Sequence, residues 1–224
     1  MTSMRVLLVK IGRRLLYGER SGVRQSIHGE GNQFLVGKAR LVNVELDIIG
    51  SNNLIIVPDD CVLINVKFHL RGSGHRIEFG HNCRVTRSGV FWFEDEEGLL
   101  QVGANTSMVE VHIAVTEARS KVVIGEECML ANDIDIRTGD SHSIINTITG
   151  ERINFAEDIV IGNHVWIAPH VVILKGVQIG DDSVVATGSI VTKSCGPGVI
   201  LAGNPAGVVK SGISWRRERL EKGE

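Results

Sequence analysis

One histidine in this chain lies where it could carry acid–base chemistry. His142 stands in the stretch RTGDSHSI, and Trp166 follows it further along the chain. A histidine titrates near neutrality, so its ring can take a proton from an attacking hydroxyl group. By residue type alone, His142 is better explained as an ordinary loop histidine. Its significance therefore depends on the elements that surround it.

Those elements are short repeats. Residues 161–196 divide without a slip into six hexapeptides, IGNHVW, IAPHVV, ILKGVQ, IGDDSV, VATGSI and VTKSCG. Each begins with an aliphatic residue and has a small residue in its fifth place. A period of six fits neither an α-helix nor an alternating strand. It predicts a parallel β-helix, in which three hexapeptides make one coil of 18 residues.

Longer coils precede these hexapeptides. The stretch LVNVELDIIGSNNLIIV (41–57) aligns with LINVKFHLRGSGHRIEF (63–79) at a shift of 22 residues. A five-residue anchor recurs as VPDDC, FGHNC, VGANT, IGEEC, IGNHV and IGDDS, which start at 57, 79, 102, 124, 161 and 179. We therefore predict an all-β solenoid with a β-helix domain over 35–200. Residues 1–34 would form an N-terminal cap, and 201–224 a turn and a short helix.

Two places interrupt the repeats. The anchors at 124 and 161 are separated by 37 residues, so a long excursion leaves the coil around 141–158. A long loop on a rigid scaffold is often functional. The second interruption is FWFEDEEG (91–98), a wide corner. It is either a solvated corner with a tucked Trp92 or one wall of an acceptor site.

The two ends of the chain predict short helices. Residues 4–17 form an amphipathic pattern that is too short and too charged to span a membrane. We expect this segment to cap the coil, and a peripheral membrane contact is the alternative. Residues 203–206 predict a tight turn, and residues 213–222 a short basic helix.

Charge and cysteine usage exclude several classes. The net charge is −2, so no basic field favours nucleic acid. The four cysteines occupy the fifth, inward place of a repeat and predict buried, inert thiols: Cys61, Cys83, Cys128 and Cys195. Their spacing suits neither a disulfide framework nor a zinc site. This usage fits a reducing, cytoplasmic environment.

With these repeats, the chain resembles the hexapeptide-repeat acyltransferases, whose coils form a left-handed β-helix. The order of coil, His142, excursion and VWIAPHVVI is similar to that in galactoside and maltose acetyltransferases and in sialic-acid capsule O-acetyltransferases. The GNPA sequence at 203–206 is a second, weaker mark. The resemblance implies that His142 is the general base and that Trp166 packs at the acceptor and thioester site. The alternative for Trp166 is simple packing on the outside of the coil.

The resemblance also implies acetyl-CoA as cosubstrate. The family lays pantetheine along the coils, Lys193 could meet the nucleotide phosphates, and Pro205 resembles the residue that packs on adenine. The positions that match the family's donor contacts are Ala168, Gly176, Thr187, Gly188, Ser189, Lys193 and Pro205. Repeat geometry alone also explains Gly176 and Gly188. The oxyanion donor is left open between a backbone N–H and the hydroxyl of Ser141 or Ser143. Asp140 or a backbone carbonyl could orient the base.

No metal is expected. His164 and His170 hold the fourth place of successive hexapeptides, so they lie on different sides of the coil and cannot share one ion within a chain. This disfavours the carbonic-anhydrase-like β-helix proteins, which need three convergent histidines.

The predicted function is acetyl-CoA-dependent O-acetyl transfer to a carbohydrate hydroxyl, on a capsular or other surface polysaccharide or its precursor, with sialic acid as one acceptor. The resemblance implies a homotrimer with the donor between neighbours, and the apolar residues in the outer, sixth place, Val172, Val184 and Ile190, would be covered in it. A streptogramin-type drug acetyltransferase and an amino-sugar N-acetyltransferase are the alternative enzymes. A catalytically silent scaffold is the non-enzymatic alternative. The sequence does not identify the acceptor sugar or its hydroxyl.

Overall fold

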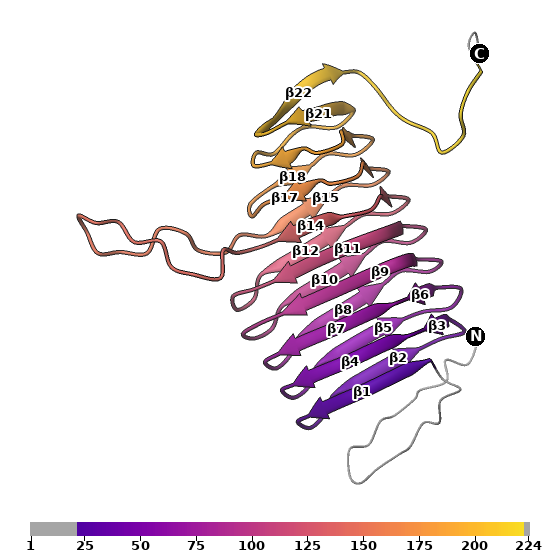
Figure 1. Ribbon diagram of the computed structural model, residues 1–224, viewed down its shortest axis with the longest axis vertical. Helices are drawn as coiled ribbons and strands as arrows, with labels where there is room; N and C mark the ends of the chain where they lie inside the picture. The colour runs from indigo at the N-terminus through magenta and orange to yellow at the C-terminus, as the bar shows by residue number, and fades with distance from the viewer. Residues whose placement is uncertain (1–21, 222–224) are drawn as a thin grey trace.

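The structure, a computed structural model, describes residues 22–221 as a stack of three-sided coils (Figure 1). The coils rise along the long axis from β1 (Val23–His28) to β22 (Ala206–Ser211), and all strand pairs are parallel except β21–β22. Residues 22–221 contain no α-helix, and so no helix that could cross a membrane. The parallel β-helix predicted from the hexapeptides is confirmed.

Each coil contributes strands to three faces. Face 1 is a seven-stranded sheet of β2 (Gln33–Val36), β5 (Leu54–Val57), β8 (Arg76–Phe79), β10 (Leu99–Val102), β12 (Lys121–Ile124), β15 (Ile159–Ile161) and β18 (Gln178–Ile179). Face 2 is formed by β3 (Arg40–Val42), β6 (Val62–Ile64), the first residues of β9 (Arg84–Phe93) and β11 (Ser107–Val115), β13 (Met129–Leu130), β16 (Trp166–Ile167), β19 (Val184–Val185) and β21 (Val199–Gly203). Face 3 is formed by β1, β4 (Val44–Ile49), β7 (Val66–Arg71), the later residues of β9 and β11, β14 (Ile134–Arg137), β17 (Val172–Ile173) and β20 (Ile190–Val191).

The long strands β9 and β11 turn the corner between face 2 and face 3 without a break. They join those two faces into one 15-stranded sheet, whereas face 1 stays separate. Three corners result, and two of them border face 3. We call the corner from face 3 to face 1 the arm corner, and the corner from face 2 to face 3 the opposite corner.

The interior changes from aromatic to aliphatic along the axis. In the longer N-terminal coils, the rings of Phe68 and Phe91 stack with 5.3 Å between their centroids, and Phe79 packs edge-on against both. In the 18-residue coils the buried places hold only smaller side chains, namely Ile161, Val165, Ile167, Val171, Ile173, Val177 and Ile179. A longer coil encloses a wider cross-section, so larger rings are needed to fill it to normal packing density.

A left-handed backbone residue forms the corner between face 1 and face 2 in every anchored coil. The fourth residue of each anchor has φ between 52° and 63°: Asp60, Asn82, Asn105, Glu127, His164 and Asp182. Asn and Asp adopt this conformation at the lowest cost among residues with a side chain. The polar residues in the fourth place therefore serve the turn. His164 occupies that place for the same conformational reason.

The fifth residue of the anchor ties one coil to the next. Cys61, Cys83 and Cys128 donate S–H bonds to the carbonyls of Gly80, Gly103 and Gly162, at 3.3, 3.1 and 3.1 Å. In the same place, Thr106 and Ser183 donate to Gly125 and Gly196. The cysteines were expected to act only as small apolar side chains, but they are also hydrogen-bond donors to buried carbonyls.

Three expectations differ from the structure or lie outside it. The strands begin at Val23, ahead of the start expected at 35. The helix predicted over 213–222 does not form in the described part, up to 221. There, Trp215 donates to the His164 carbonyl and Arg217 to the carbonyls of Glu127 and Cys128, which requires an extended chain. The helix predicted over 4–17 lies outside the described residues.

The four thiols should differ in reactivity. All were expected to be buried, but Cys195 is half-buried. It lies at the end of face 1, where its backbone pairs with Ile179 of β18, the last strand of that face. Burial raises the pKa of the Cys128 thiol to about 11, which leaves little thiolate at neutral pH. Under an excess of a thiol reagent, we expect one fast reaction from Cys195 and three reactions at the rate of unfolding. Cys195→Ser should remove the fast phase, and fast labelling of Cys61, Cys83 or Cys128 would contradict this assignment.

Candidate active site

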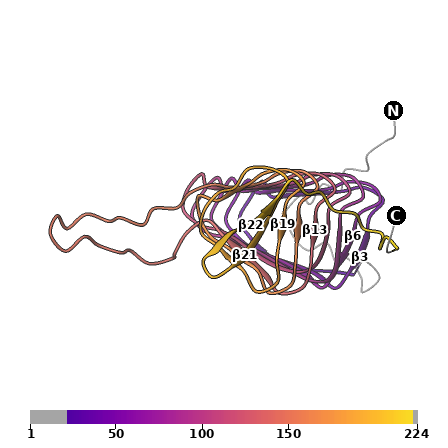
Figure 2. The same cartoon turned by 90° about the horizontal axis from the view of Figure 1, so that it is seen from above.

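The long excursion is an arm that leaves the coil at the arm corner, between β14 and β15. Residues 138–158 project sideways from the stack and return to it (Figures 1 and 2). This is the excursion that the 37-residue interval predicts. The rigid β-helix fixes where the arm begins and ends.

Backbone pairing makes the outer arm a short hairpin. Ile145 forms an antiparallel bridge with Arg152, and the Ile153 N–H donates to the Ile144 carbonyl at 2.9 Å. At the tip, the Asn146 side chain accepts from the backbone N–H groups of Ile148 and Thr149. The arm is therefore an ordered element with its own hydrogen bonds.

The buried Asn154 side chain joins the two strands at the base of the arm. Its amide nitrogen donates to the His142 carbonyl at 2.7 Å and to an Asp140 carboxylate oxygen at 2.8 Å. Its amide oxygen accepts from the Ile144 N–H at 2.7 Å and from Arg152 Nε at 3.1 Å. This single side chain fixes the backbone on both sides of His142.

Two ion pairs tie the base of the arm to the coils. Lys175 pairs with Asp140, and Arg152 pairs with Glu117 of the coil below. The Lys175 ammonium group lowers the pKa of the Asp140 carboxyl, and the Asn154 amide adds to this effect. Asp140 is therefore ionised at neutral pH and stabilises the base of the arm.

The His142 side chain is exposed, and within residues 22–221 its ring makes no hydrogen bond or ion pair. Its backbone N–H donates to the Asp140 carbonyl at 2.8 Å. The Asp140 carboxylate bonds to Lys175 and Asn154, so within one chain it does not orient the ring as one alternative had it. The ring is available to a group from outside this chain.

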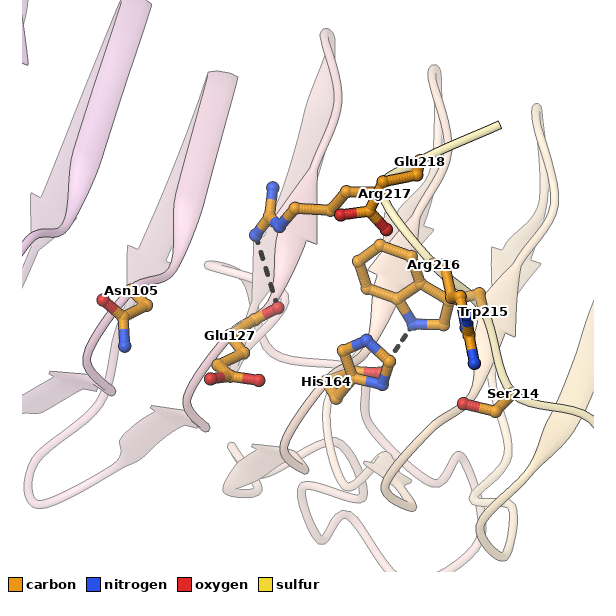
Figure 3. Close-up of a pocket in the computed structure, with 8 residues that line it drawn as sticks. All are labelled: Asn105, Glu127, His164, Ser214, Trp215, Arg216, Arg217 and Glu218. Atoms are coloured by element: carbon orange, nitrogen blue, oxygen red, sulfur yellow. Dashed lines mark hydrogen bonds between the residues drawn. The ribbon is translucent and has the colours of Figure 1, made fainter. Parts of the chain in front are cut away.

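Trp166 lies on β16 with its side chain outward. On face 2 it pairs with Met129 of the coil below and with Val184 of the coil above. The C-terminal segment crosses this region as a strap of residues 213–218. Trp215 is buried, and its ring stacks on the His164 ring with 4.3 Å between the two centroids. The centroids of the Trp215 and Trp166 rings are 6.0 Å apart. Figure 3 shows the strap, with Arg217 bonded to the backbone carbonyl of Glu127. The recess beside the strap has a volume of about 570 Å³. Trp166 is thus half-buried beside the strap.

The residues predicted to contact the donor divide between the two corners that border face 3. At the opposite corner lie Ala168, Thr187, Gly188, Ser189 and, in the β21–β22 turn, Pro205. At the arm corner lie Gly176 and Lys193. Trp166 belongs with the first group, and His142 with the second. No contact within the described chain joins His142 to Trp166.

The surroundings of these residues separate those that can meet a ligand from those that support the coil. Thr187, Gly188 and Lys193 are exposed, and a Cβ on Gly188 would have no neighbour within 4 Å. Ser189 is fully buried, and its hydroxyl accepts from the Gly203 N–H. Gly176 has φ 76°, and a Cβ there would lie 2.6 Å from Glu157. Ser189 and Gly176 therefore have structural roles in this chain.

The remaining histidines form no metal centre in the part of the chain that the structure describes. His164 pairs with Asp182 at 2.8 Å, and His170 pairs with Asp133 at 2.7 Å. His164 and His170 lie at two different corners, as their hexapeptide spacing predicts.

Comparison with known proteins identifies the family. Residues 158–193 match the model for the bacterial transferase hexapeptide, six repeats. Over 152 residues, the chain is 34% identical to a polysialic acid O-acetyltransferase of Neisseria meningitidis, covering 67% of this chain and 69% of that protein. Two solved structures match with a TM-score of 0.83. The polySia-specific acetyltransferase NeuO is 30% identical, over 88% of this chain and 90% of its own, and the polysialic acid O-acetyltransferase OatWY is 32% identical, over 88% and 93%.

The repeats and the fold place this protein among the hexapeptide transferases. The relatives then narrow the class: the chain belongs to the hexapeptide-repeat acetyltransferases and is an enzyme of that family. The resemblance stated from the sequence is confirmed.

Two structural supports of this region were not identified from the sequence. Asn154 stands in INFAED, where no repeat assigns it a place. Trp215 stands in a segment that predicts a helix. A lone Trp in a charged tail was a signal for packing against the coil, but the sequence does not give its partner.

Removing the Asn154 side chain should loosen the arm. In Asn154→Ala, four hydrogen bonds at the base are lost and the Ile144 N–H loses its acceptor, which costs about 1–3 kcal/mol per buried group. We expect amide exchange at Ile144 and Ile153 to accelerate at least about tenfold. Thr147→Ala, at the exposed tip, is the matched control. Unchanged exchange in Asn154→Ala would show that the ion pairs alone hold the arm.

Proposed function

We propose that the protein transfers an acetyl group from acetyl-CoA to a hydroxyl of a carbohydrate polymer, with His142 as general base. The observation that carries this proposal is the exposed ring of His142, which makes no hydrogen bond to any residue in 22–221 and stands on a backbone fixed by Asn154. The relatives' names support a polysaccharide acceptor, since they are O-acetyltransferases of polysialic acid. The carbohydrate class is carried over from them, and the cytoplasm is the proposed location.

In the proposed reaction, the acceptor hydroxyl attacks the thioester carbonyl while the His142 ring takes its proton. The tetrahedral intermediate then expels the CoA thiolate, which takes the proton back from the imidazolium. The new ester bond forms and the thioester bond breaks without an acetyl-enzyme. A neutral imidazole suits both steps because it gains and then returns one proton near neutrality. The developing oxyanion needs a donor, and the backbone N–H groups and the hydroxyls of Ser141 and Ser143 beside the ring remain the candidates.

Coenzyme A fits the exposed members of the predicted donor set. Thr187 and Gly188 present an open backbone corner, and Lys193, which makes no ion pair within residues 22–221, offers a cation for phosphate. We therefore propose that Thr187, Gly188, Lys193 and Pro205 contact the donor, whereas Ala168 is buried in this chain.

We propose that the working enzyme is a homotrimer, with each site built between two copies. In one chain, His142 and Trp166 lie beyond opposite corners of face 3, so a neighbour must supply one of them if both act at one centre. The arm also carries apolar side chains that its own chain leaves exposed, namely Ile144, Ile145, Ile148, Ile153 and Phe155. Exposed apolar patches of this kind mark contact surfaces.

Loss of His142 should affect the chemical step. His142→Ala should lower kcat by about 10²–10⁴-fold, the usual contribution of a general base. Acetyl-CoA affinity, measured separately by calorimetry, should change little because other residues hold the donor. His142→Gln is the comparison that retains side-chain volume. A folded His142→Ala enzyme that binds acetyl-CoA and keeps a normal kcat would remove His142 from the mechanism.

Loss of Trp166 should have a different kinetic effect. Because Trp166 would shape the site without moving a proton, Trp166→Ala should raise KM for the acceptor as well as lower kcat. Trp166→Phe should restore most of both parameters. If only kcat fell and KM for the acceptor stayed constant, the role in acceptor packing would be wrong.

The oligomer can be tested on the arm. Each exposed apolar side chain that a neighbour covers should contribute about 1.5–3 kcal/mol. Ile148 is 93% exposed and Phe155 60% exposed in one chain, so the double change Ile148→Asp and Phe155→Asp should convert trimers to monomers in sedimentation. Val209→Asp, at a 63% exposed position on β22, is the control and should stay trimeric. A monomeric wild-type protein under assay conditions would refute the trimer.

A further inference from the structure

The C-terminal strap, residues 213–218, crosses three successive coils at the corner between faces 1 and 2 (Figure 3). Polar side chains attach it on both sides of Trp215. The Ser214 hydroxyl donates to an Asp182 carboxylate oxygen at 3.0 Å, and Arg217 donates to the Cys128 carbonyl at 3.1 Å. The strap therefore has attachments to the coils that do not involve the Trp215 ring.

Trp215 is held in one orientation at the middle of the strap. Its indole N–H donates to the His164 carbonyl at 2.7 Å, and its ring lies on the His164 ring with 11° between the two planes. The His164 ring is itself fixed, because its Nδ1 donates to Asp182 at 2.8 Å. The bonds from His164 and Ser214 lower the pKa of the Asp182 carboxyl, so this acceptor is ionised at neutral pH. One hydrogen bond and one stack thus define the position and the plane of the Trp215 ring.

Trp166 receives its aromatic contact from Trp215. The two ring planes are tilted by 48° and the centroids are 6.0 Å apart, which is within the range of an attractive aromatic pair. Within residues 22–221, no other ring and no side-chain hydrogen bond holds the Trp166 indole. On face 2 its neighbours are Met129, which is unbranched and flexible, and Val184, which is smaller than an indole. Trp215 is therefore the rigid support that the described chain gives to this ring.

Such a support matters because Trp166 lies on a strand. Residues on strands commonly adopt either of two χ1 rotamers, so the strand does not by itself choose one direction for the indole. An aromatic pair shifts the ratio of two populations about 2–10-fold beyond the effect of burial. The contact with Trp215 thus favours one rotamer. The Trp166 indole N–H, for which residues 22–221 supply no acceptor, then has one preferred direction toward a ligand.

We propose that Trp215 is a positioning residue, which holds the Trp166 ring in the direction required at the acceptor and thioester site. Trp215 acts through Trp166 and does not touch the substrate, since it is only 7% exposed. This inference rests on the proposed function for the role of Trp166. It makes the irregular C-terminal strap a working part of the site, together with the coils and the arm.

Fluorine NMR tests the contact without any substrate. The chain has three tryptophans, so labelling with 5-fluorotryptophan gives three signals, which single Trp→Phe variants assign. In Trp215→Leu, we expect the Trp166 signal to shift or to divide between two rotamers, whereas the Trp92 signal stays in place. Ser214→Ala removes one attachment of the strap without removing a ring, and as the matched control it should leave the Trp166 signal unchanged. A Trp166 signal that is unchanged in folded Trp215→Leu would overturn the inference.

Kinetics test the connection with the reaction. The acceptor is the one that the wild type acetylates fastest among polysialic acid and oligosaccharides of glucose, galactose and N-acetylglucosamine. Trp215→Leu should raise the acceptor KM about 2–10-fold, the range expected for losing an aromatic pair. Trp215→Phe, which keeps a ring, should retain most of the wild-type KM. A purely structural role would reduce the amount of active enzyme, and hence the apparent kcat, without raising KM.

A double-mutant cycle shows whether Trp215 acts through Trp166. In that case, Trp166→Ala combined with Trp215→Leu should have the same acceptor KM and kcat as Trp166→Ala alone, because the ring to be positioned is already absent. If the two effects instead multiply, Trp215 acts on the reaction by another route and the inference is wrong.

His164→Asn is a second variant that reaches the same contact from the other side. Asparagine suits the left-handed backbone of this place, as at Asn82 and Asn105, but it removes the ring on which Trp215 stacks. It should shift the Trp166 fluorine signal and raise the acceptor KM in the same direction as Trp215→Leu. If Trp215→Leu does not fold, His164→Asn decides the question.

The outcomes separate this inference from the proposed function. A wild-type protein that acetylates none of the acceptors would count against the proposed function, and the fluorine signals would still decide whether Trp215 positions Trp166. Acetyl transfer with an acceptor KM that is indifferent to Trp215→Leu would support the proposed function and overturn the positioning role.

Discussion

The hydrogen bonds between successive coils at the corner of faces 1 and 2 are the constraint on which the rest of the structure depends. All six anchors have a left-handed residue in the fourth place, and five of them also have a side-chain donor in the fifth, as in Asn82 and Cys83. The left-handed residue turns the chain, and the donor satisfies a glycine carbonyl of the next coil. Buried carbonyls without a donor are costly, so this corner sets both the shape of a coil and its stacking. Faces 2 and 3 inherit their register from it.

Because the register is fixed, the chain can place functional groups far from one another in sequence at defined positions. The arm leaves at one corner of face 3, and the exposed Thr187 and Gly188 lie at the other. The wider N-terminal coils extend the same face downward to Trp92 and His69. The rigid sheet thus holds the exposed donor positions and the arm at defined places on the two borders of one face, which limits the reorganisation needed on binding.

Segments without repeats stabilise the places where the repeats end or break. Asn154 holds the arm through four hydrogen bonds, and Trp215 closes the strap against His164. Both side chains are buried although their segments are irregular. A loop that carries chemistry must be as well defined as the coil itself, and these buried side chains provide that definition.

The sequence by itself determined the solenoid, the spacing of its repeats from residue 35 onward, and the point where the arm leaves. These follow from local, periodic requirements: an aliphatic residue inward, a small fifth residue and a gap of 37 residues between two anchors. It also identified His142 and Trp166 as residues of interest, and the inward position of Cys61, Cys83 and Cys128.

Only the tertiary structure decided what depends on contacts between distant residues. It showed that His142 and Trp166 lie beyond opposite corners of face 3, and that Ser189 is buried while Thr187 is exposed. It also replaced the helix expected over 213–222 with a strap, because Trp215 and Arg217 bond to carbonyls more than fifty residues away in sequence. A helical pattern records local preference, and such long-range bonds can override it. The stack of His69 and Trp92 depends in the same way on strand register, which no local pattern displays.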